Sequence, residues 1–292
     1  MHHKSFLYGM LAVTIVIWGA SFVIVDIAIR EGSSPVMIAM ARFVVASAIF
    51  GAYLLLRRPK GIAKADRRMF LGLAFIGIGV YYIFQYYGVK LAGASISSIL
   101  VMLFCPVFIF AISAWKFREP VSIGEMLGLG LSGLGCLLVI TNGSLSMASV
   151  WETVVGGLLG VVCALFWAVY TVEGKRVVRT YDPMTSTAYI TILGTLMLAP
   201  LALADAQLTG QAYPASFFLA ALYLGVLCTV VGYMFWFRAL TGLDAKSTGV
   251  VLYFEPVVTI FFAWALLNET IGWVSATGAA ITAAGVILVS RR

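Results

Sequence analysis

The sequence predicts an all-α integral membrane protein with ten transmembrane helices, built as two inverted five-helix repeats, with both termini in the cytoplasm. The composition, the number of long apolar segments and an internal repeat lead to this prediction. Of the 292 residues, 62% are hydrophobic and only 11% are charged, as expected for a chain whose surface largely faces lipid. Backbone polar groups find no partners in hydrocarbon, so the segments that cross it must be helices. The alternation typical of outer-membrane strands is absent.

Ten apolar segments are long enough to cross a hydrocarbon core of about 30 Å, which requires about 20 residues in a helix. The connections between them are short and leave no room for a soluble domain. The first segment lacks a small-residue cleavage site, so we expect it to be retained as a span rather than removed as a signal peptide. We expect the spans at residues 6–27, 35–56, 69–88, 92–114, 122–141, 153–173, 183–204, 216–237, 246–266 and 272–290.

The basic residues predict the orientation in the membrane. With the N-terminus in the cytoplasm, all but three of the 19 Lys and Arg residues fall at the cytoplasmic side, as the positive-inside rule requires. The exceptions are Arg30 and Lys90 outside and Arg42 within the second span. Topology therefore explains the net charge of +7, and we expect no nucleic-acid partner, because no groove-reading motif accompanies these dispersed charges.

The two halves of the chain resemble each other. Residues 90–140 align with residues 240–290 without a gap, and the first parts of the halves agree more loosely. We therefore divide the chain into a first repeat, residues 1–145, and a second repeat, residues 146–292. The matched pairs are Pro106 and Pro256, Glu119 and Glu269, Gly128 and Gly278, and Gly135 and Gly285 at an offset of 150, Trp18 and Trp167 at 149, and Pro35 and Pro183 at 148.

The odd number of spans in each half indicates inverted repeats, because the second half then enters the membrane from the opposite face. Two similar halves of opposite orientation can exchange conformations and open a central site to each face in turn, which is typical of transporters working by alternating access. Channels use such repeats less often. A duplicated scaffold protein is the remaining alternative of this kind.

The sequence carries no signature of an enzyme. Its histidines are His2 and His3 at the N-terminus, and it has no metal-spaced cluster, phosphate loop or Ser/His/Asp set. The four cysteines lie singly inside apolar spans, where we expect them to pack rather than to react. We therefore expect a protein that is not an enzyme, with no cofactor and no metal ion.

Three motifs point to a known family. They are Trp18-Gly19-Ala20-Ser21-Phe22 in the first span, Trp115-Lys116-Phe117-Arg118-Glu119-Pro120 after the fourth, and Leu267-Asn268-Glu269-Thr270 after the ninth. With the paired five-helix repeats, they resemble the drug/metabolite transporter superfamily, EamA-type, over nearly the whole chain. The resemblance leans towards the bacterial aromatic amino acid exporters of that superfamily. Since the second half has Ala168 and Val169 in place of Gly19 and Ala20, we do not expect the two halves of the site to be identical.

This resemblance implies export of amino acids, metabolites or toxic compounds across the bacterial inner membrane. The expected partners are a small, amino acid-like substrate, aromatic or otherwise neutral, and the lipid bilayer, and we take a monomer as the working assembly. Another metabolite or drug, such as a nucleotide sugar or a toxic cation, and import instead of export are the open alternatives. The sequence sets neither the direction of flux nor proton coupling.

Two charged residues within spans are the first candidates for substrate contact. Glu255 is the most deeply placed acidic residue, and burying it costs about 3 kcal/mol on insertion scales, which usually marks function. We expect it to face the central cavity and either contact a substrate amine or cycle through protonation. Arg42 lies two turns inside the second span, where it can bind a substrate carboxylate. The alternatives are a protonated Glu255 hydrogen-bonded within the bundle and a structural, snorkelling Arg42.

Matched prolines and a set of aromatic residues complete the candidate site. Pro106 and Pro256 fall near the middle of spans four and nine and are expected to act as gating hinges, or else as kinks without substrate contact. Tyr82 and Gln85 share a helix face, as residues three apart do, deep enough to line a polar, aromatic pocket. The weaker candidates, which core packing also explains, are Trp18, Trp167, Tyr170 and Tyr253.

Overall fold

The computed structural model describes residues 2–118, 121–141, 150–209, 213–267 and 272–290, and the matched Glu119 and Glu269 lie outside these ranges. Throughout the described ranges the regular structure is helical, with no strand. The helices are α1 (His2–Arg30), α2 (Pro35–Arg57), α3 (Arg67–Ala74), α4 (Tyr81–Phe117), α5 (Ile123–Thr141), α6 (Val150–Val177), α7 (Pro183–Thr209), α8 (Ala215–Leu222), α9 (Gly232–Gly242), α10 (Ala245–Val250), α11 (Glu255–Leu267) and α12 (Trp273–Ser290).

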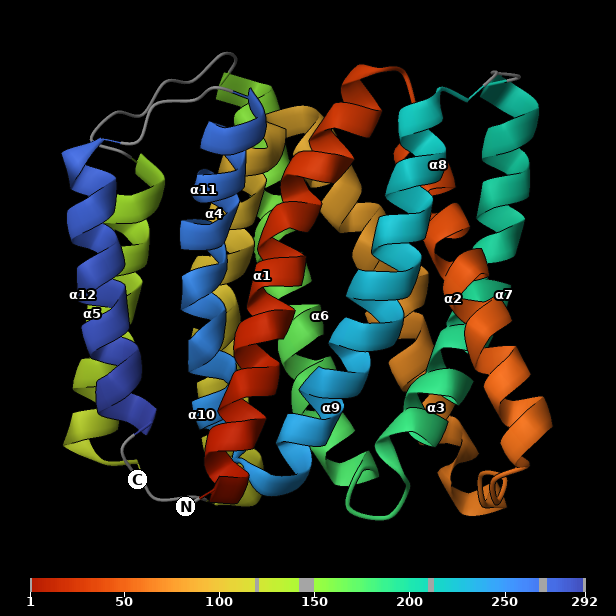
Figure 1. The fold of residues 1–292 in the computed structure, drawn as a ribbon, viewed down its shortest axis with the longest axis horizontal. Helices are drawn as coiled ribbons and strands as arrows, with labels where there is room; N and C mark the ends of the chain where they lie inside the picture. Colours follow the sequence, from red (N-terminus) through yellow and green to blue (C-terminus); the bar gives the residue numbers. More distant parts are fainter. Residues whose placement is uncertain (1, 119–120, 142–149, 210–212, 268–271, 291–292) are drawn as a thin grey trace.

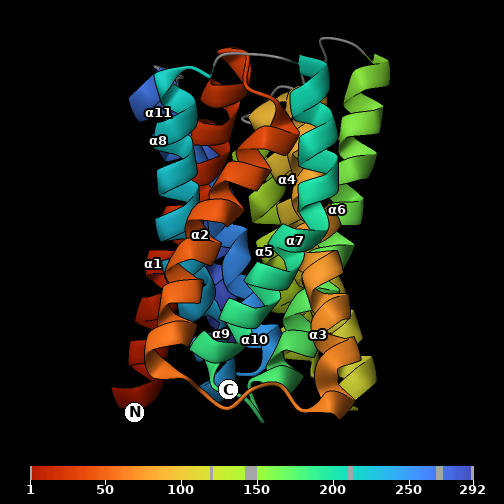
Figure 2. The ribbon, with the colours of Figure 1, turned by 90° about the vertical axis from the view of Figure 1, so that its right-hand side faces the viewer.

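Seven helical stretches of the described chain are long and apolar enough to cross a membrane. Three shorter apolar helices accompany them, at Val101–Phe117, Ile123–Leu138 and Ala276–Val289. The helices run roughly alongside one another, and both chain termini lie at one end of the bundle (Figures 1 and 2). We call this end, where α1 and α10 begin and α6 and α9 end, the terminal face, and the other end the opposite face. The expectation of an all-helical membrane protein is confirmed.

The third and fourth expected spans are not separated by a loop, in contrast to the prediction. The backbone stays helical throughout α4, from Tyr81 to Phe117. Phe70 in α3 packs against Tyr181 beyond the end of α6, with ring centroids 5.3 Å apart, and Phe117 lies 5.7 Å from the Lys175 ammonium in the last turn of α6. Both ends of the α3–α4 stretch therefore reach the terminal face. The chain crosses the bundle and comes back through helical backbone, without a loop between the two passages.

Irregular helical segments interrupt three of the membrane stretches. A π-helical segment, Phe75–Val80, joins α3 to α4, and a second one, Tyr223–Val231, joins α8 to α9. A 3-10 turn, Val251–Phe254, joins α10 to α11. Such segments shift the register of side chains and release backbone carbonyls from the regular hydrogen-bond ladder. All three adjoin the buried centre of the molecule, where the candidate residues lie.

Residues that match between the two halves also meet in space. Trp18 and Trp167 lie edge to face with ring centroids 5.1 Å apart, and the hydroxyls of Tyr82 and Tyr233, 151 positions apart, share a hydrogen bond of 2.5 Å. Further contacts at offsets of 148 or 150 join Ser47 to Thr195, Leu103 to Tyr253 and Ser132 to Thr282.

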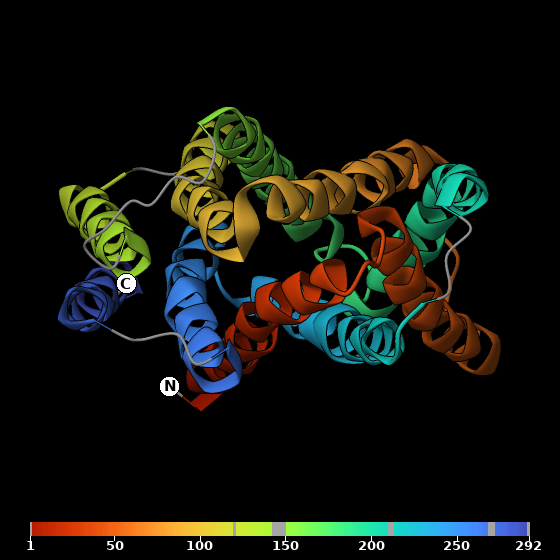
Figure 3. The same cartoon turned by 90° about the horizontal axis from the view of Figure 1, so that it is seen from above.

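Helices α5 and α12 pack closely against each other at one side of the bundle (Figure 3). Small residues permit this approach, as is common between helices in membranes. A Cβ atom added at Gly135 would lie 2.7 Å from the Gly278 carbonyl oxygen, and one added at Gly128 would lie 2.7 Å from a methyl group of Val289. The matched glycines of the repeat therefore serve helix packing.

We expect Gly135→Ala to lower the melting temperature in detergent, because the added methyl group must push α5 away from α12 at a cost of about 1–3 kcal/mol. Gly130→Ala is the matched control on the same helix, since no atom lies within 4 Å of its added Cβ. That control should be neutral or stabilising, because alanine favours a helix over glycine by about 1 kcal/mol. Equal melting temperatures for both variants would contradict the packing role of Gly135.

Candidate functional site

A small buried cavity lies where helices of both halves meet. Six of the eight residues expected to bind substrate line it, namely Trp18, Arg42, Tyr82, Gln85, Trp167 and Glu255, together with Ser21, Tyr81, Met102 and Leu252. The cavity volume is about 30 Å³, which is room for about two water molecules. A molecule as large as an amino acid therefore requires the lining side chains to move apart.

Arg42 is a buried cation, only 3% exposed. Its Nε donates to Thr229 Oγ1 at 2.7 Å and its Nη1 to Tyr86 Oη at 3.1 Å, while the guanidinium carbon lies 4.2 Å from the centroid of the Tyr82 ring. These neutral partners fix the side chain by hydrogen bonds and a cation–π contact. Among the described residues no carboxylate forms an ion pair with Arg42.

Glu255 is an equally buried acid, also 3% exposed. It is the first residue of α11, directly after the 3-10 turn, and its backbone N–H donates to the Leu252 carbonyl of that turn. Its Oε2 has no hydrogen-bond partner in the described chain, and no described cation pairs with it. A guanidinium group and a carboxyl group thus line one cavity, and among the described residues neither has a partner of opposite charge.

The two matched prolines lie in different surroundings. Pro256 is the second residue of α11, where its missing N–H removes no helical hydrogen bond, and the 3-10 turn precedes it. Pro106 lies inside the continuous helix α4. The helix break therefore occurs at Pro256, next to Glu255, and is not repeated at Pro106.

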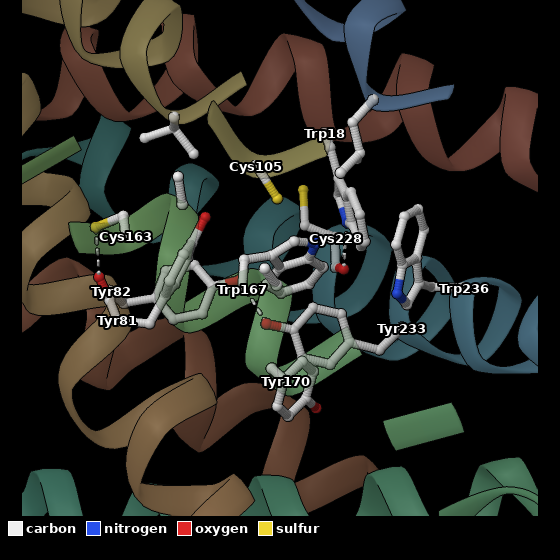
Figure 4. Close-up of a cluster of buried hydrophobic side chains, with 14 of the residues drawn as sticks. Trp18, Tyr81, Tyr82, Cys105, Cys163, Trp167, Tyr170, Cys228, Tyr233 and Trp236 are labelled. Atoms are coloured by element: carbon white, nitrogen blue, oxygen red, sulfur yellow. Dashed lines mark hydrogen bonds between the residues drawn. The ribbon is translucent and has the colours of Figure 1, made fainter. Parts of the chain in front are cut away.

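A cluster of aromatic side chains adjoins the cavity (Figure 4). Trp18 packs against Trp167, Tyr233 and Trp236 with ring centroids 5.1, 6.0 and 5.3 Å away, and Tyr170 packs against Trp167 at 5.4 Å. The Trp18 indole donates to the Cys228 carbonyl at 2.9 Å, a carbonyl that lies in the π-helical segment between α8 and α9. We call Trp18, Trp167, Tyr170, Tyr233 and Trp236 the aromatic cluster.

The cavity and the aromatic cluster share Trp18 and Trp167, and their other members differ in which face they are nearer. Arg42 lies about two turns inside α2, and this helix begins at the opposite face. Tyr170 and Trp236 lie about two turns before the ends of α6 and α9, and both helices end at the terminal face. Arg42 is therefore on the side of the opposite face, and Tyr170 and Trp236 are on the side of the terminal face.

Ion pairs between the two halves add to the closure of the terminal face. Lys116 at the end of α4 pairs with Glu173 of α6. Lys246 at the start of α10 pairs with Glu125 of α5, with Nζ 3.0 Å from Oε1. Each pair joins one half of the chain to the other, so separating the halves at this face requires breaking both.

Two expected residues do not line the cavity. Tyr253 lies in the 3-10 turn, two residues before Glu255, and therefore points in a different direction from it. The Tyr253 hydroxyl donates to the Leu103 carbonyl at 3.3 Å. Tyr170 lies behind Trp167 in the aromatic cluster. The partners of Arg42, Thr229 and Tyr86, were not predicted. Thr229 lies in a π-helical segment that no periodicity in the sequence signals, whereas Tyr86 lies one turn after Tyr82 on the same face of α4.

No metal site is found in the part of the chain that the structure describes, where no three His, Cys, Asp or Glu residues gather. The polar groups that meet in the cavity are one guanidinium group, one carboxyl group and several neutral hydrogen-bonding groups. Such a set can bind an organic molecule that carries both charges.

Comparisons with known proteins cover the whole chain. The model of the EamA-like transporter family matches twice, over residues 5–141 and 154–291. A transporter of Archaeoglobus fulgidus described as uncharacterized is 35% identical, over 100% of this chain and 99% of its own. A probable terminal-alkyne amino-acid exporter of Streptantibioticus cattleyicolor is 26% identical, over 97% and 92%. A crystal structure with 19% identity has a TM-score of 0.77 and covers 98% of this chain and 96% of its own, which shows a shared fold.

Proposed function

The chain belongs to the EamA-like transporter family, and from this membership and the cavity we propose that it exports amino acids, aromatic or otherwise neutral, across the bacterial inner membrane. Membership makes it a multi-pass membrane transporter with a small-molecule substrate. The amino acid, the direction and the mechanism belong to the proposal. A relative described as a probable amino-acid exporter supports the substrate class.

The observation that carries the proposal is a pair of ionisable side chains, Arg42 and Glu255, that line one buried cavity without a partner of opposite charge among the described residues. A buried charge without a partner is unfavourable, and a ligand of opposite charge removes this penalty. An amino acid carries a carboxylate for Arg42 and an ammonium group for Glu255. The aromatic walls, Trp18, Trp167 and Tyr81, suit a flat or apolar side chain by stacking and burial.

Several features support two inverted repeats, residues 1–145 and 146–292, working by alternating access. The family model matches each half separately, and matched residues of the halves meet in the centre of the bundle. The long apolar helices and the three shorter ones together suit ten spans. Both termini lie at the terminal face, which the basic residues assign to the cytoplasm.

We interpret the conformation as one closed towards the cytoplasm. The aromatic cluster and the two ion pairs between the halves support closure at the terminal face, and the position of Arg42 supports a cavity nearer the outside. The break at Pro256, beside Glu255, is the hinge that we propose for α10 and α11, with Pro106 as the bend of α4 in the other repeat. Opening the terminal face then exposes Glu255 to cytoplasmic substrate.

Counterflow in proteoliposomes tests this function. We expect saturable exchange of labelled phenylalanine and tryptophan, weaker exchange of threonine, and none of a nucleotide sugar, whose phosphates would be repelled by Glu255. Repeating the assay with an imposed pH gradient separates proton-coupled from facilitative transport. Exchange of the nucleotide sugar without any amino acid exchange would overturn the substrate class and leave the family unaffected.

A further inference from the structure

We propose that substrate passes through a second binding site, aromatic and without a counterpart of Arg42, which Tyr170, Tyr233 and Trp236 form when the protein opens to the terminal face. This inference rests on the alternating access proposed above. If two repeats exchange conformations, the cavity of the other state is lined by the counterparts of the residues that line it here. The aromatic cluster contains these counterparts.

The correspondence follows from pairs that meet in the structure. Trp18 and Trp167 match at an offset of 149. At the same offset, Tyr170 is the counterpart of the cavity residue Ser21. Tyr82 touches Tyr233 at an offset of 151. One helical turn further on, the same offset takes the cavity residue Gln85 to Trp236. Small or polar residues on the side of the opposite face are thus replaced by large aromatic ones on the side of the terminal face.

Neither charged residue has a charged counterpart. At the offset of 148 that pairs Pro35 with Pro183, the counterpart of Arg42 is Ile190. At the offset of 150 that pairs Pro106 with Pro256, the counterpart of Glu255 is Cys105. Both counterparts are completely buried in the core. Glu255 adjoins the break in the helix and remains available to either cavity, whereas Arg42 lies towards the opposite face. The counterparts of the cavity residues therefore include no cation for the carboxylate.

Unpartnered polar atoms mark the aromatic cluster as a place for a ligand. Tyr170 Oη, Trp167 Nε1 and Trp236 Nε1 are all buried without a hydrogen-bond partner in the described chain. The rings that carry them are close together, with the Trp167 centroid 5.4 Å from that of Tyr170 and 5.9 Å from that of Trp236. Buried donors are nearly always satisfied in a native structure. Opening this cluster would let them donate to a substrate carboxylate.

The second site would thus bind the same amino acid by ring stacking, with neutral hydrogen bonds to its carboxylate. Neutral hydrogen bonds are weaker than those of a guanidinium group. We therefore expect a higher half-saturation concentration from the terminal face than from the opposite face. Right-side-out and inside-out membrane vesicles each present one face and allow both values to be measured.

Tyr170→Phe is the decisive variant, because it removes a hydroxyl that has no partner in this conformation. The melting temperature should not fall. Half-saturation by phenylalanine from the terminal face should rise about threefold to tenfold, the effect of one hydrogen bond, and should change less than about twofold from the opposite face. Tyr8→Phe, in an apolar pocket between α1 and α12, is the matched control. If Tyr170→Phe proves unstable, Trp236→Phe takes its place.

A labelling experiment separates this inference from the proposed function. Trp236→Cys, with the four native cysteines replaced by alanine, should react with an impermeant thiol reagent from the terminal face, and substrate should slow the reaction. No labelling from that face under any transport condition would overturn alternating access and the second site together. Labelling combined with an unchanged half-saturation in Tyr170→Phe and Trp236→Phe would overturn the second site alone.

Discussion

Glu255→Gln is expected to raise the half-saturation concentration for amino acids about tenfold to a hundredfold, because a hydrogen bond to a charged group contributes about 1.5–3 kcal/mol. Glutamine has nearly the same shape and keeps the packing beside Pro256. It also removes a buried charge that no described residue neutralises, so stability should be maintained or improved. Counterflow of labelled phenylalanine, together with a melting curve in detergent, measures both quantities.

The matched control for this variant is Glu31→Gln, an exposed glutamate just beyond the end of α1, where its carboxylate accepts a hydrogen bond from Ser216. It should leave transport unchanged. Any dependence of transport on pH that survives Glu255→Gln belongs to other groups. Wild-type half-saturation in Glu255→Gln would remove this residue from the binding site and leave it as a buried structural carboxyl group.

The sequence allowed the charged part of the site to be predicted because charges inside a membrane are rare and costly. Glu255 and Arg42 were found on this ground alone, and both line the same cavity. The aromatic residues could be ranked less well, since aromatic side chains serve packing as often as binding. Trp18 and Trp167 line the cavity, whereas Tyr170 lies behind them.

The helical irregularities could not be predicted from hydrophobic periodicity. A π-helical segment inserts one residue into a helix without changing its apolar character, yet Tyr223–Val231 places Thr229 against Arg42 and the Cys228 carbonyl against Trp18. The 3-10 turn before Glu255 likewise fixes which side of the chain Tyr253 faces. The continuity of α4 also escaped prediction, although the residues between spans three and four include no proline to end a helix.

Arg42→Gln is expected to raise the half-saturation concentration for phenylalanine by a similar factor, about tenfold to a hundredfold, by removing the cation that meets the carboxylate. The half-saturation concentration of Arg42→Lys should lie between those of the wild type and Arg42→Gln. One ammonium group cannot bind Thr229 and Tyr86 and also offer the two parallel donors of a guanidinium group to the substrate. Arg57→Gln, at the exposed end of the same helix, is the control. These values come from the counterflow assay, with expression and melting temperature recorded for each variant.

Substrate analogues distinguish recognition of the carboxylate from a structural role of Arg42. Phenethylamine lacks the carboxylate of phenylalanine, and 3-phenylpropionate lacks its amine. We expect Arg42→Gln to weaken inhibition by 3-phenylpropionate but not by phenethylamine, and Glu255→Gln to do the reverse, so that each variant couples to one substrate group as in a double-mutant cycle. If Arg42→Gln weakened all three ligands equally, Arg42 would act by holding α2 to Thr229 and Tyr86. In that case Glu255 alone would recognise charge, and the substrate class would change from amino acids to amines.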